Sequence, residues 1–407
     1  MKVPQIFDRN MKRLAFLDNA VSVGYSLEIN SLWTATFTLP ADDDKNAYCQ
    51  PLNFVEIFDG DERIDLFRII GEDLERSNGA TRFYDCEHVL ATLLSDVLFQ
   101  YHQYGGGGIK TADVLNYVDK RAVRPYEVQN YVLARQTTRN WVLGDCDYKR
   151  YFEYNWENST LLAALFAVPE CFDSEYMWTW DTTVYPWTIS LVTPSDAMKS
   201  EVRYAKNMTS MKKTVDASGI ANRIYALGYG EGVNQLTIAG VNGGKPYVED
   251  AMSIQQYGLC STILVDSRYE VAENLKGYAE QMLAELKNPY VSYEIGAIDL
   301  HRLTGDTFSK FRPGEIVRVV DEADGINLRT RIVSVEKSDA QGDPGSVTVT
   351  IANKSKDIAG SISELQNRAL INETYAQGAT NQQIYNFTDN ADATHPATLK
   401  LYISDSV

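Results

Sequence analysis

The residues best suited to acid–base or metal chemistry in this sequence are its four histidines, His88, His102, His301 and His395. None has HxxxH or HExxH spacing, which would place two imidazoles on one helix face to hold zinc. No serine lies in a GxSxG turn, which the nucleophile of an α/β-hydrolase requires. Asp145 and Asp147 are close in sequence, but this spacing is more typical of a solvated turn than of an acid–base pair. We therefore predict no catalytic residue and no metal ligand.

Two glycine-rich runs have the composition of nucleotide-binding loops. Residues 105–111, GGGGIKT, precede a predicted helix but lack the GxxxxGK[ST] spacing that holds phosphate. Residues 228–232, GYGEG, lie between two predicted strands, and no helix follows them directly as a dinucleotide fingerprint requires. Both runs are interpreted as loops, and no cofactor is predicted.

The cysteines are odd in number, widely spaced and without a CxxC pair, which disfavours a disulfide framework or a zinc site. They are Cys49, Cys86, Cys146, Cys171 and Cys260. We expect free buried thiols in a protein made in a reducing cytoplasm. No signal peptide opens the chain and no apolar run approaches a membrane span.

The charge of the chain restricts its partners. The formal net charge is −17 over 407 residues. A nucleic-acid binder needs lysine and arginine to displace phosphate counterions, and an anionic membrane attracts the same residues. A lumen through which DNA slides without sticking would favour the negative sign instead. With 44% hydrophobic residues the chain can bury real cores, and its 25 tyrosines and six tryptophans suit β-sheets and interfaces.

The first hundred residues favour strands at 21–29, 33–39, 54–59, 64–71 and 82–87, followed by an apolar helix at 88–98. Asn30-Ser31 supplies the turn within the first strand pair, and Gly60-Asp61 supplies the turn within the second. The pattern predicts a small β-barrel module with one helix.

The middle of the chain predicts a mixed α+β region. Thr111 can cap a helix that runs through Val114, Leu115 and Val118, and Ser159 can cap a second helix at 159–168. Strands are expected at 141–144, 176–181 and 187–192.

From residue 201 the β pattern resumes, with strands expected at 223–228, 235–240, 291–300, 316–321, 328–337 and 347–351. The clearest helix spans 269–286, with apolar residues at helical spacing, and Pro289 stops it. The unit again predicts a barrel with one helix.

The resulting fold class is α+β and β-rich, with several domains. We expect a first β-barrel domain at 1–103, a mixed α+β domain at 104–200, a second barrel-containing domain at 201–355 and a C-terminal helix and tail at 356–407. In the last segment, Ile358, Ile362, Leu365, Ala369 and Ala376 lie near heptad a and d positions. This thin apolar stripe predicts a helix that pairs with copies of itself or lies on the body. A strand is expected at 399–403, and the abrupt end indicates a fragment or a short member of a longer family.

A resemblance covers most of residues 1–355. The segment NRIYALGYGEGVNQLTI at 222–238 resembles the core of the prophage tail endopeptidase family, also called phage minor structural or tail-associated lysin proteins. Further segments fit the same family in order and spacing: 141–144, 202–208, 247–250, 257–258, 266–269, 298–300, 331–333 and 351–354, together with Phe311 and Gly314.

The resemblance implies a fold like the baseplate hub of contractile-tailed phages, with two related tube-type β-barrel domains in each chain. A homotrimer would then form a pseudo-sixfold ring in the virion tail, continuing the tail tube. Its partners would be the distal tail protein, the tape measure protein and tail fibre or receptor-binding proteins, with DNA passing through the lumen without specific binding and no membrane contact. Peptidoglycan cleavage in such proteins belongs to added C-terminal domains, so no catalytic residue is carried over.

Two other functions remain open. A cell-wall endopeptidase or glycosidase would need an isolated carboxylate or Cys/His site in the middle domain. A saccharide receptor-binding module would use the tryptophan-rich region 178–187, although tryptophans are more often core residues.

Overall fold

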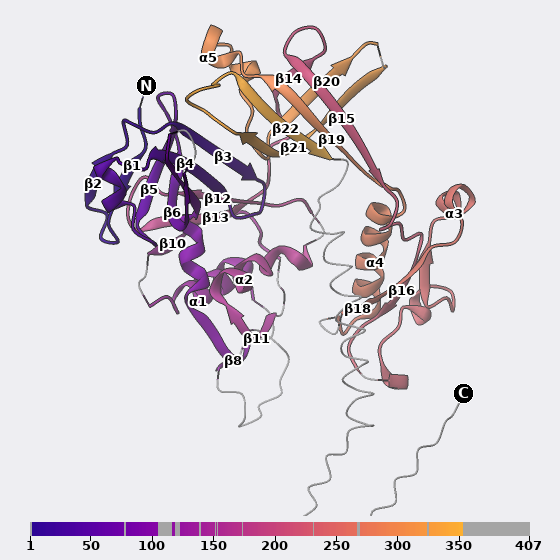
Figure 1. The fold of residues 1–407 in the computed structure, drawn as a ribbon. Helices are drawn as coiled ribbons and strands as arrows, with labels where there is room; N and C mark the ends of the chain where they lie inside the picture. The colour runs from indigo at the N-terminus through magenta and orange to yellow at the C-terminus, as the bar shows by residue number, and fades with distance from the viewer. Residues whose placement is uncertain are drawn as a thin grey trace, which may run out of the picture. The chain divides into compact units, whose positions relative to one another are not determined.

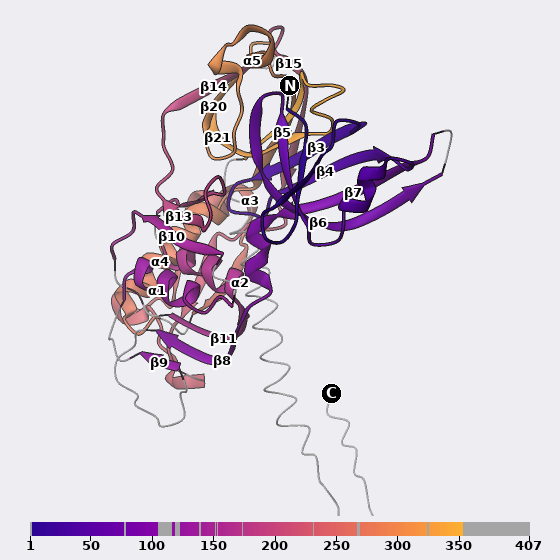
Figure 2. The same ribbon diagram turned by 90° about the vertical axis from the view of Figure 1, so that its left-hand side faces the viewer.

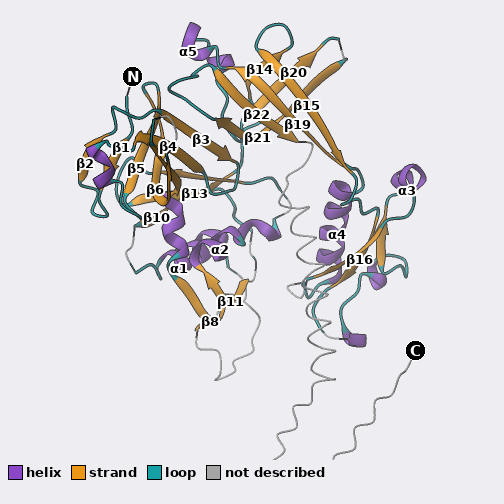
Figure 3. Cartoon of the chain, in the orientation of Figure 1, coloured by secondary structure: helices purple, strands orange, loops and turns teal. Residues whose placement is uncertain are grey.

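The computed structural model describes residues 2–76, 79–104, 116–118, 123–137, 140–150, 152, 154–172, 174–230, 232–266, 269–323 and 325–352. Residues up to Lys356 form one compact unit, and residues 353–407 are not described. The helix and the strand expected in 356–407 therefore lie outside the described residues. The β-rich character expected from the sequence is confirmed (Figures 1 and 3).

The first seven strands, here called the first strand group, follow one another with short connections. They are β1 (Gln5–Phe7), β2 (Arg13–Phe16), β3 (Ser22–Glu28), β4 (Thr34–Pro40), β5 (Phe54–Asp59), β6 (Glu62–Glu75) and β7 (Thr81–His88). The predicted hairpins β3–β4 and β5–β6 are antiparallel pairs. Alternate residues point inward, so that Val23, Phe37, Ile57 and Phe67 form one core with less than 1% exposure each. Alternating apolar and polar residues produce this one-sided burial.

The middle region has two three-stranded sheets around a separate core. One sheet has the order β11 (Tyr154–Thr160), β8 (Val97–Tyr104), β9 (Asn116–Val118), and the other β10 (Trp141–Cys146), β13 (Trp187–Val192), β12 (Met177–Asp181). Helices α1 (Pro125–Leu133) and α2 (Leu161–Phe166) lie with them. Trp141, Trp178 and Trp187 are core residues here, as expected for large aromatic side chains.

The second strand group contains the remaining strands of the large sheet. They are β14 (Met198–Arg203), β15 (Met208–Asp216), β19 (Tyr290–Ile298), β20 (Ile316–Asp321), β21 (Ile326–Lys337) and β22 (Ser346–Ala352). Val202, Ile295, Val317, Val335 and Val349 belong to its core. A short helix, α5 (His301–Thr304), follows β19.

A small α/β unit is inserted between β15 and β19. Its sheet has the order β17 (Tyr247–Glu249), β16 (Arg223–Leu227), β18 (Ser261–Val265), and its helices are α3 (Ala251–Tyr257) and α4 (Ala272–Leu286). The predicted helix 269–286 is thus α4, which buries Leu275, Ala279 and Leu286 and packs on β16 and β17.

One continuous sheet joins the two strand groups. Its path runs β15-β19-β22-β21-β3-β4-β7-β6-β5-β1-β2, with β20 and β14 branching from β21. The joining ladder is antiparallel, with Val335 opposite Leu27 and Lys337 opposite Tyr25. Figure 2 shows the β6–β7 hairpin extending beyond β3 and β4.

Several local predictions in the first half of the chain are wrong. Residues 88–98 hold only a short 3-10 helix, Val89–Leu94, and then enter strand β8. Val118 ends strand β9 and not a helix, whereas residues 111–115 lie outside the described residues. Thr160, not Ser159, caps α2, because its side chain accepts a hydrogen bond from the Ala163 amide. Helix α1 was not expected.

The predicted strand 235–240 is also wrong. This stretch has 3-10 turns at Gly232–Asn234 and Ala239–Val241, with a single bridge between Leu227 and Thr237. Glycines at positive φ, Gly230 and Gly232, precede it and break the extended backbone. Helix α3 and strand β18 were likewise not expected.

Among the described residues, none of the helices has both the length and the apolar character that crossing a membrane would require.

Candidate functional site

His88 and Asp65 form the arrangement most similar to an acid–base pair. His88 Nε2 lies 3.4 Å from Asp65 Oδ2. The Nδ1 atom of His88 accepts a hydrogen bond of 3.2 Å from the Leu90 amide, so the ring proton belongs on Nε2, facing the carboxylate. The pair joins His88 at the end of β7 to Asp65 in the first third of β6.

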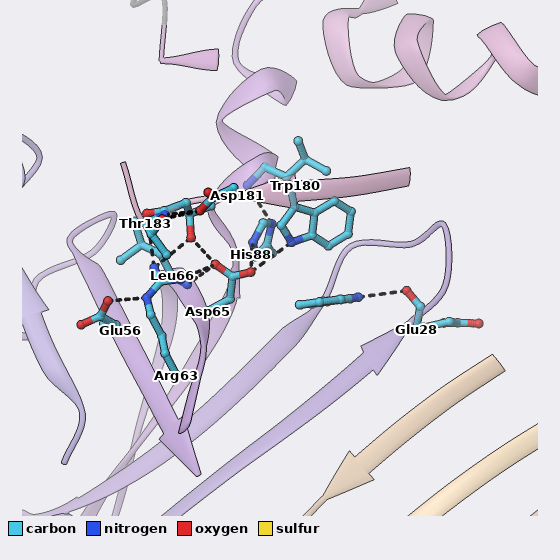
Figure 4. A network of polar contacts seen from close by, with 12 residues as sticks. Glu28, Glu56, Arg63, Asp65, Leu66, His88, Trp180, Asp181 and Thr183 are labelled. Carbon is cyan, nitrogen blue, oxygen red and sulfur yellow. Dashed lines mark hydrogen bonds and ion pairs between the residues drawn. The ribbon is translucent and has the colours of Figure 1, made fainter. Parts of the chain in front are cut away.

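Asp65 is the centre of a wider buried network, shown in Figure 4. It accepts hydrogen bonds from Trp180 Nε1 at 3.1 Å and from the Leu66 amide at 2.8 Å. Thr182 Oγ1 donates to the same carboxylate. Arg63 contacts Asp65 at 3.3 Å and donates to Thr182 Oγ1 at 2.8 Å. The network therefore joins β6 of the first strand group to the end of β12 in the middle region.

The environment of Asp65 favours its charged form. Burial alone would raise the pKa of this carboxyl, but His88, Arg63 and the Thr182 hydroxyl more than offset that effect and lower it. A buried carboxylate held in this way is ionised at neutral pH.

This network cannot work as a catalytic dyad. His88 has no exposed surface and lies among the rings of Trp33, Trp141 and Trp180. A general base must come within hydrogen-bonding distance of its substrate, and no substrate atom reaches a side chain enclosed in this way. The network is a structural joint between the first strand group and the middle region.

A second buried cluster joins the two strand groups. The Lys337 ammonium on β21 is 2.7 Å from Asp59 Oδ2 at the end of β5 and 2.8 Å from Asp299 Oδ2. It also donates to the Pro344 carbonyl at 3.0 Å. Tyr25 on β3 donates its hydroxyl proton to Asp59 at 3.0 Å. Lys337 is only 2% exposed, so all its hydrogen bonds are made within the protein.

The tyrosine of this cluster is held protonated. Burial, and then the charge of Asp59, raise the pKa of Tyr25 well above its ordinary value. Tyr25 therefore remains a hydrogen-bond donor across the accessible pH range, and the cluster keeps its pattern of donors and acceptors.

Around the Lys337 cluster, the backbone of β3 and the backbone that follows β21 are also in direct contact. Ala340 donates its amide to the Val23 carbonyl at 2.7 Å, and Asp339 Oδ1 accepts from the Val23 amide at 3.3 Å. A Cβ atom on Gly24 would lie 2.8 Å from the Ser338 carbonyl oxygen, so only glycine fits without a shift. Glu62 adds ion pairs of 2.5 Å to Lys310 and Arg312 on the second strand group. We call this whole contact the seam.

The outward face of the continuous sheet is hydroxyl-rich and acidic from β15 to β6, and we call it the lane. Cross-strand pairs place small polar residues opposite one another along it, such as Ser26 with Thr34. Its other small residues on the central strands are Ser22, Gly24, Thr36, Thr38, Ser334, Thr348 and Thr350.

Carboxylates outnumber cations on the lane. The carboxylates are Glu28, Asp73, Glu75, Asp85, Glu87, Asp216, Glu294 and Glu336. The two cations each lie beside one of them, Arg68 at 2.6 Å from Glu87 and Lys212 at 3.7 Å from Glu294. The lane is therefore a broad, negatively charged surface on which most of the uncharged side chains are short.

The remaining candidate residues do not assemble into a site. His102 is bound by the Tyr131 hydroxyl and the Phe99 carbonyl, and burial lowers its pKa. Asp145 and Asp147 are exposed, and the carboxylate of Asp147 accepts from the Thr193 amide. His395 and residues 105–111 lie outside the described residues. Within the part of the chain that is described, no three His, Cys, Asp or Glu side chains could share a metal ion.

The tryptophan-rich region is mostly interior. Trp178 is 3% and Trp187 is 1% exposed, so neither ring is open to stack on a sugar. The loop 228–232 is closed by backbone bonds between Gly228 and Leu236 and between Leu236 and Tyr229. Cys49, Cys86, Cys146, Cys171 and Cys260 are all free thiols.

Sequence reasoning missed both buried clusters. Lys337, Asp59 and Asp299 come from distant segments, so no single stretch of the sequence shows that they meet. One signal was present: Lys337 continues the inward register of Val335 on β21, where a charged residue requires a buried partner.

The sequence of this chain was compared with protein families and with curated proteins. Residues 196–362 match the family described as prophage endopeptidase tail, which confirms the resemblance over this part of the chain. No curated protein sequence matches the chain.

Three solved structures share the fold. Prophage tail protein gp18 from Listeria monocytogenes is 13% identical, with a TM-score of 0.57 over 91% of this chain and 99% of its own. A tail protein from Neisseria meningitidis is 10% identical, with a TM-score of 0.61 over 86% of this chain and 96% of its own. The 43 kDa tail protein of prophage MuSo2 from Shewanella oneidensis is 13% identical, with a TM-score of 0.57 over 88% and 98%.

Proposed function

We propose that this chain, with its prophage tail fold and its family match over residues 196–362, is a structural hub of a bacteriophage tail tip. Three copies form a ring that closes or extends the tail tube. The two strand groups act as two tube-type β-barrel domains, within the divisions 1–103, 104–200, 201–355 and 356–407, so three chains supply six similar units.

The observation that carries this proposal is the seam. A ring with sixfold character from three chains requires a fixed angle between the two barrels of each chain. The Lys337 cluster, the β21–β3 ladder and the Glu62 ion pairs supply three independent constraints on that angle. A buried charged cluster specifies one geometry, because any other leaves a charge without its partner.

The lane supports the second part of the proposal, passage of DNA. We assign the lane to the wall of the lumen. Its serine and threonine side chains are short, and its excess charge is negative. Such a surface repels phosphates and offers few cationic side chains to bind the duplex. The overall charge of −17 acts in the same direction.

The hub assembles with other tail components. We propose the distal tail protein, the tape measure protein and tail fibre or receptor-binding proteins as its neighbours, in the virion tail. Pull-down of each of these proteins with the full chain tests the neighbours one at a time.

Mass and symmetry test the ring directly. Light scattering on the full chain at rising concentration, and negative-stain imaging of assembled tail tips, are expected to give a trimer and a ring of six lobes. A tail tip with one or two copies, or a ring of different symmetry, contradicts the proposal.

Lysines placed on the lane test the lumen assignment. Thr36→Lys with Thr348→Lys is expected to leave the ring intact and to make it retain DNA at low salt, since each lysine offers a phosphate contact. The matched control places lysine at Met252 of α3 and Ile263 of β18, two exposed residues of the inserted α/β unit that are not part of the large sheet. Equal DNA retention by both variants rules out the lane as the wall.

The word endopeptidase in the family description raises a second function, cleavage of cell-wall peptides. The one histidine–carboxylate pair described above is enclosed and has no path to substrate. A zymogram of the purified chain on Gram-positive cell walls is expected to show no clearing. Clearing that a single substitution abolishes would replace the hub proposal with a lysin.

A further inference from the structure

The lane ends in two strand edges that have no partner among the described residues. At one end, β15 pairs with β19 on one side only. At the other, β6 is covered by β5 up to Arg68 and by backbone bonds of Leu52 and Asn53 at Ile69. Beyond that point, residues 70–75 of β6 pair with β7 alone. An exposed edge presents unpaired amides and carbonyls that accept another strand.

On the lane face the free part of β6 is acidic, whereas β15 carries a lysine. The cross-strand register places Lys212 of β15 on this face, beside Glu294, with Asp216 at the end of the same strand. On β6 the same register, through the pairs with Phe83 and Thr81, places Asp73 and Glu75 there.

The two edges also match on their other face. Lys213 and Val215 of β15 lie there, and so do Glu72 and Leu74 of β6. Val215 is 57% and Leu74 is 43% exposed. Each edge thus presents a charged side chain beside an apolar one on this face, and Lys213 is opposite in sign to Glu72, which also pairs with Arg82 of β7.

Strand direction fits the same pairing. Every neighbouring pair from β15 through β19, β22, β21, β3, β4 and β7 to β6 is antiparallel. The direction therefore alternates along these strands, and β15 and β6 point in opposite directions. A copy related by rotation about an axis along the strands brings its β15 antiparallel to β6 of its neighbour.

We propose that β15 of a second copy of this chain adds to residues 70–75 of β6, extending the lane from one subunit to the next. The contact joins two different surfaces, so repetition by rotation closes a ring. This inference rests on the proposed ring and names the edges that close it.

Lysine on an exposed strand edge can also protect that edge against pairing with another chain. Lys212 and Lys213 would have this role if β15 had no partner in the assembled ring. Three features favour pairing here. The β15 strand has nine residues, the opposite end of the same sheet is acidic, and Lys212 is weakly engaged, being 74% exposed beside a Glu294 that is 57% exposed. Such an exposed pair contributes little and exchanges readily.

Cysteine pairs on the full chain test the contact at any affinity. Lys212→Cys is combined with Asp73→Cys or with Glu75→Cys, both on the lane face. The matched control combines Lys212→Cys with Glu72→Cys, which lies on the opposite face of β6. Mild oxidation is expected to give a reducible product of three chains from a lane-face pair and not from the control or the parent chain. Cross-linking of neither lane-face pair above the control overturns the proposal.

Charge reversal separates this proposal from the ring itself. Lys212→Glu with Lys213→Glu, or Asp73→Lys with Glu75→Lys, is expected to weaken the trimer by about tenfold or more, and the four changes together to restore it. If all variants form the trimer equally and no lane-face pair cross-links, the proposed trimer is supported and the β15–β6 contact is contradicted. If the parent chain forms no trimer at any concentration and the cysteine pairs do not cross-link, both the ring and the edge contact are contradicted.

Discussion

The ammonium of Lys337 lies 2.7 Å from the carboxylate of Asp59, 278 residues away in sequence, and both side chains are buried. This single pair connects the two strand groups through a charge that has no access to water. The pair therefore does more than add stability, since it selects the angle at which the two groups meet.

Replacement of Lys337 by methionine tests the seam. Lys337→Met keeps the length of the side chain but leaves Asp59 and Asp299 buried without their cation. The free energy of unfolding is expected to fall by about 3–5 kcal/mol, measured by denaturant unfolding of the full chain. Lys212→Met, at a 74% exposed position, is the control and should change it by less than about 0.5 kcal/mol. Equal effects of the two substitutions would show that the buried ion cluster is not required.

Stability should also depend on pH through Asp65. Its pKa in the folded protein is below the ordinary value, so it stabilises the fold at neutral pH. That contribution is lost as the pH falls from the ordinary range of an aspartate through the lower folded pKa. Asp65→Asn should therefore be less stable than the parent at pH 7, and the difference should shrink in acid. A difference in unfolding free energy that stays constant from neutral to acidic pH would contradict this assignment.

Gly24 should tolerate no side chain. In Gly24→Ala the new Cβ meets the Ser338 carbonyl oxygen at 2.8 Å and Thr36 Oγ1 at 2.7 Å. The hydroxyl can rotate away, but the carbonyl belongs to the seam backbone, so a loss of about 1–3 kcal/mol is expected. Gly219→Ala is the matched control, because nothing lies within 4 Å of its Cβ position. Thermal unfolding of the two variants decides the matter, and an unchanged midpoint for Gly24→Ala would sink the close-contact argument.

The cap of α2 can be tested by two neighbouring substitutions. Thr160→Ala removes the acceptor for the Ala163 amide, which costs about 1 kcal/mol at a helix N-terminus. Ser159→Ala should cost less, since the Ser159 hydroxyl bonds only the Thr160 carbonyl at 3.2 Å. Denaturant midpoints measure both, and the reverse order would restore Ser159 as the cap.

Local signals in the sequence were sufficient for the hairpins and for α4. The turn residues between β5 and β6 and the alternation in β3 and β4 act over a few residues, so they can be recognised without the rest of the fold. The same holds for the helical spacing of Leu275, Ala279 and Met282. Residues 88–98 were misjudged because a short apolar run satisfies a helix and a strand equally well, and packing against Trp141 and the middle-region core decided between them.

The amino-acid sequence by itself determined the β-rich class, the negative charge and the resemblance to prophage tail proteins, because each depends on composition or on local order. The tertiary structure alone decided where Lys337 lies, which faces make the lane, and which strand edges remain unpaired. Burial and register between distant strands are properties of the assembled sheet, and the alternation along β21 does not show which carboxylates Lys337 meets.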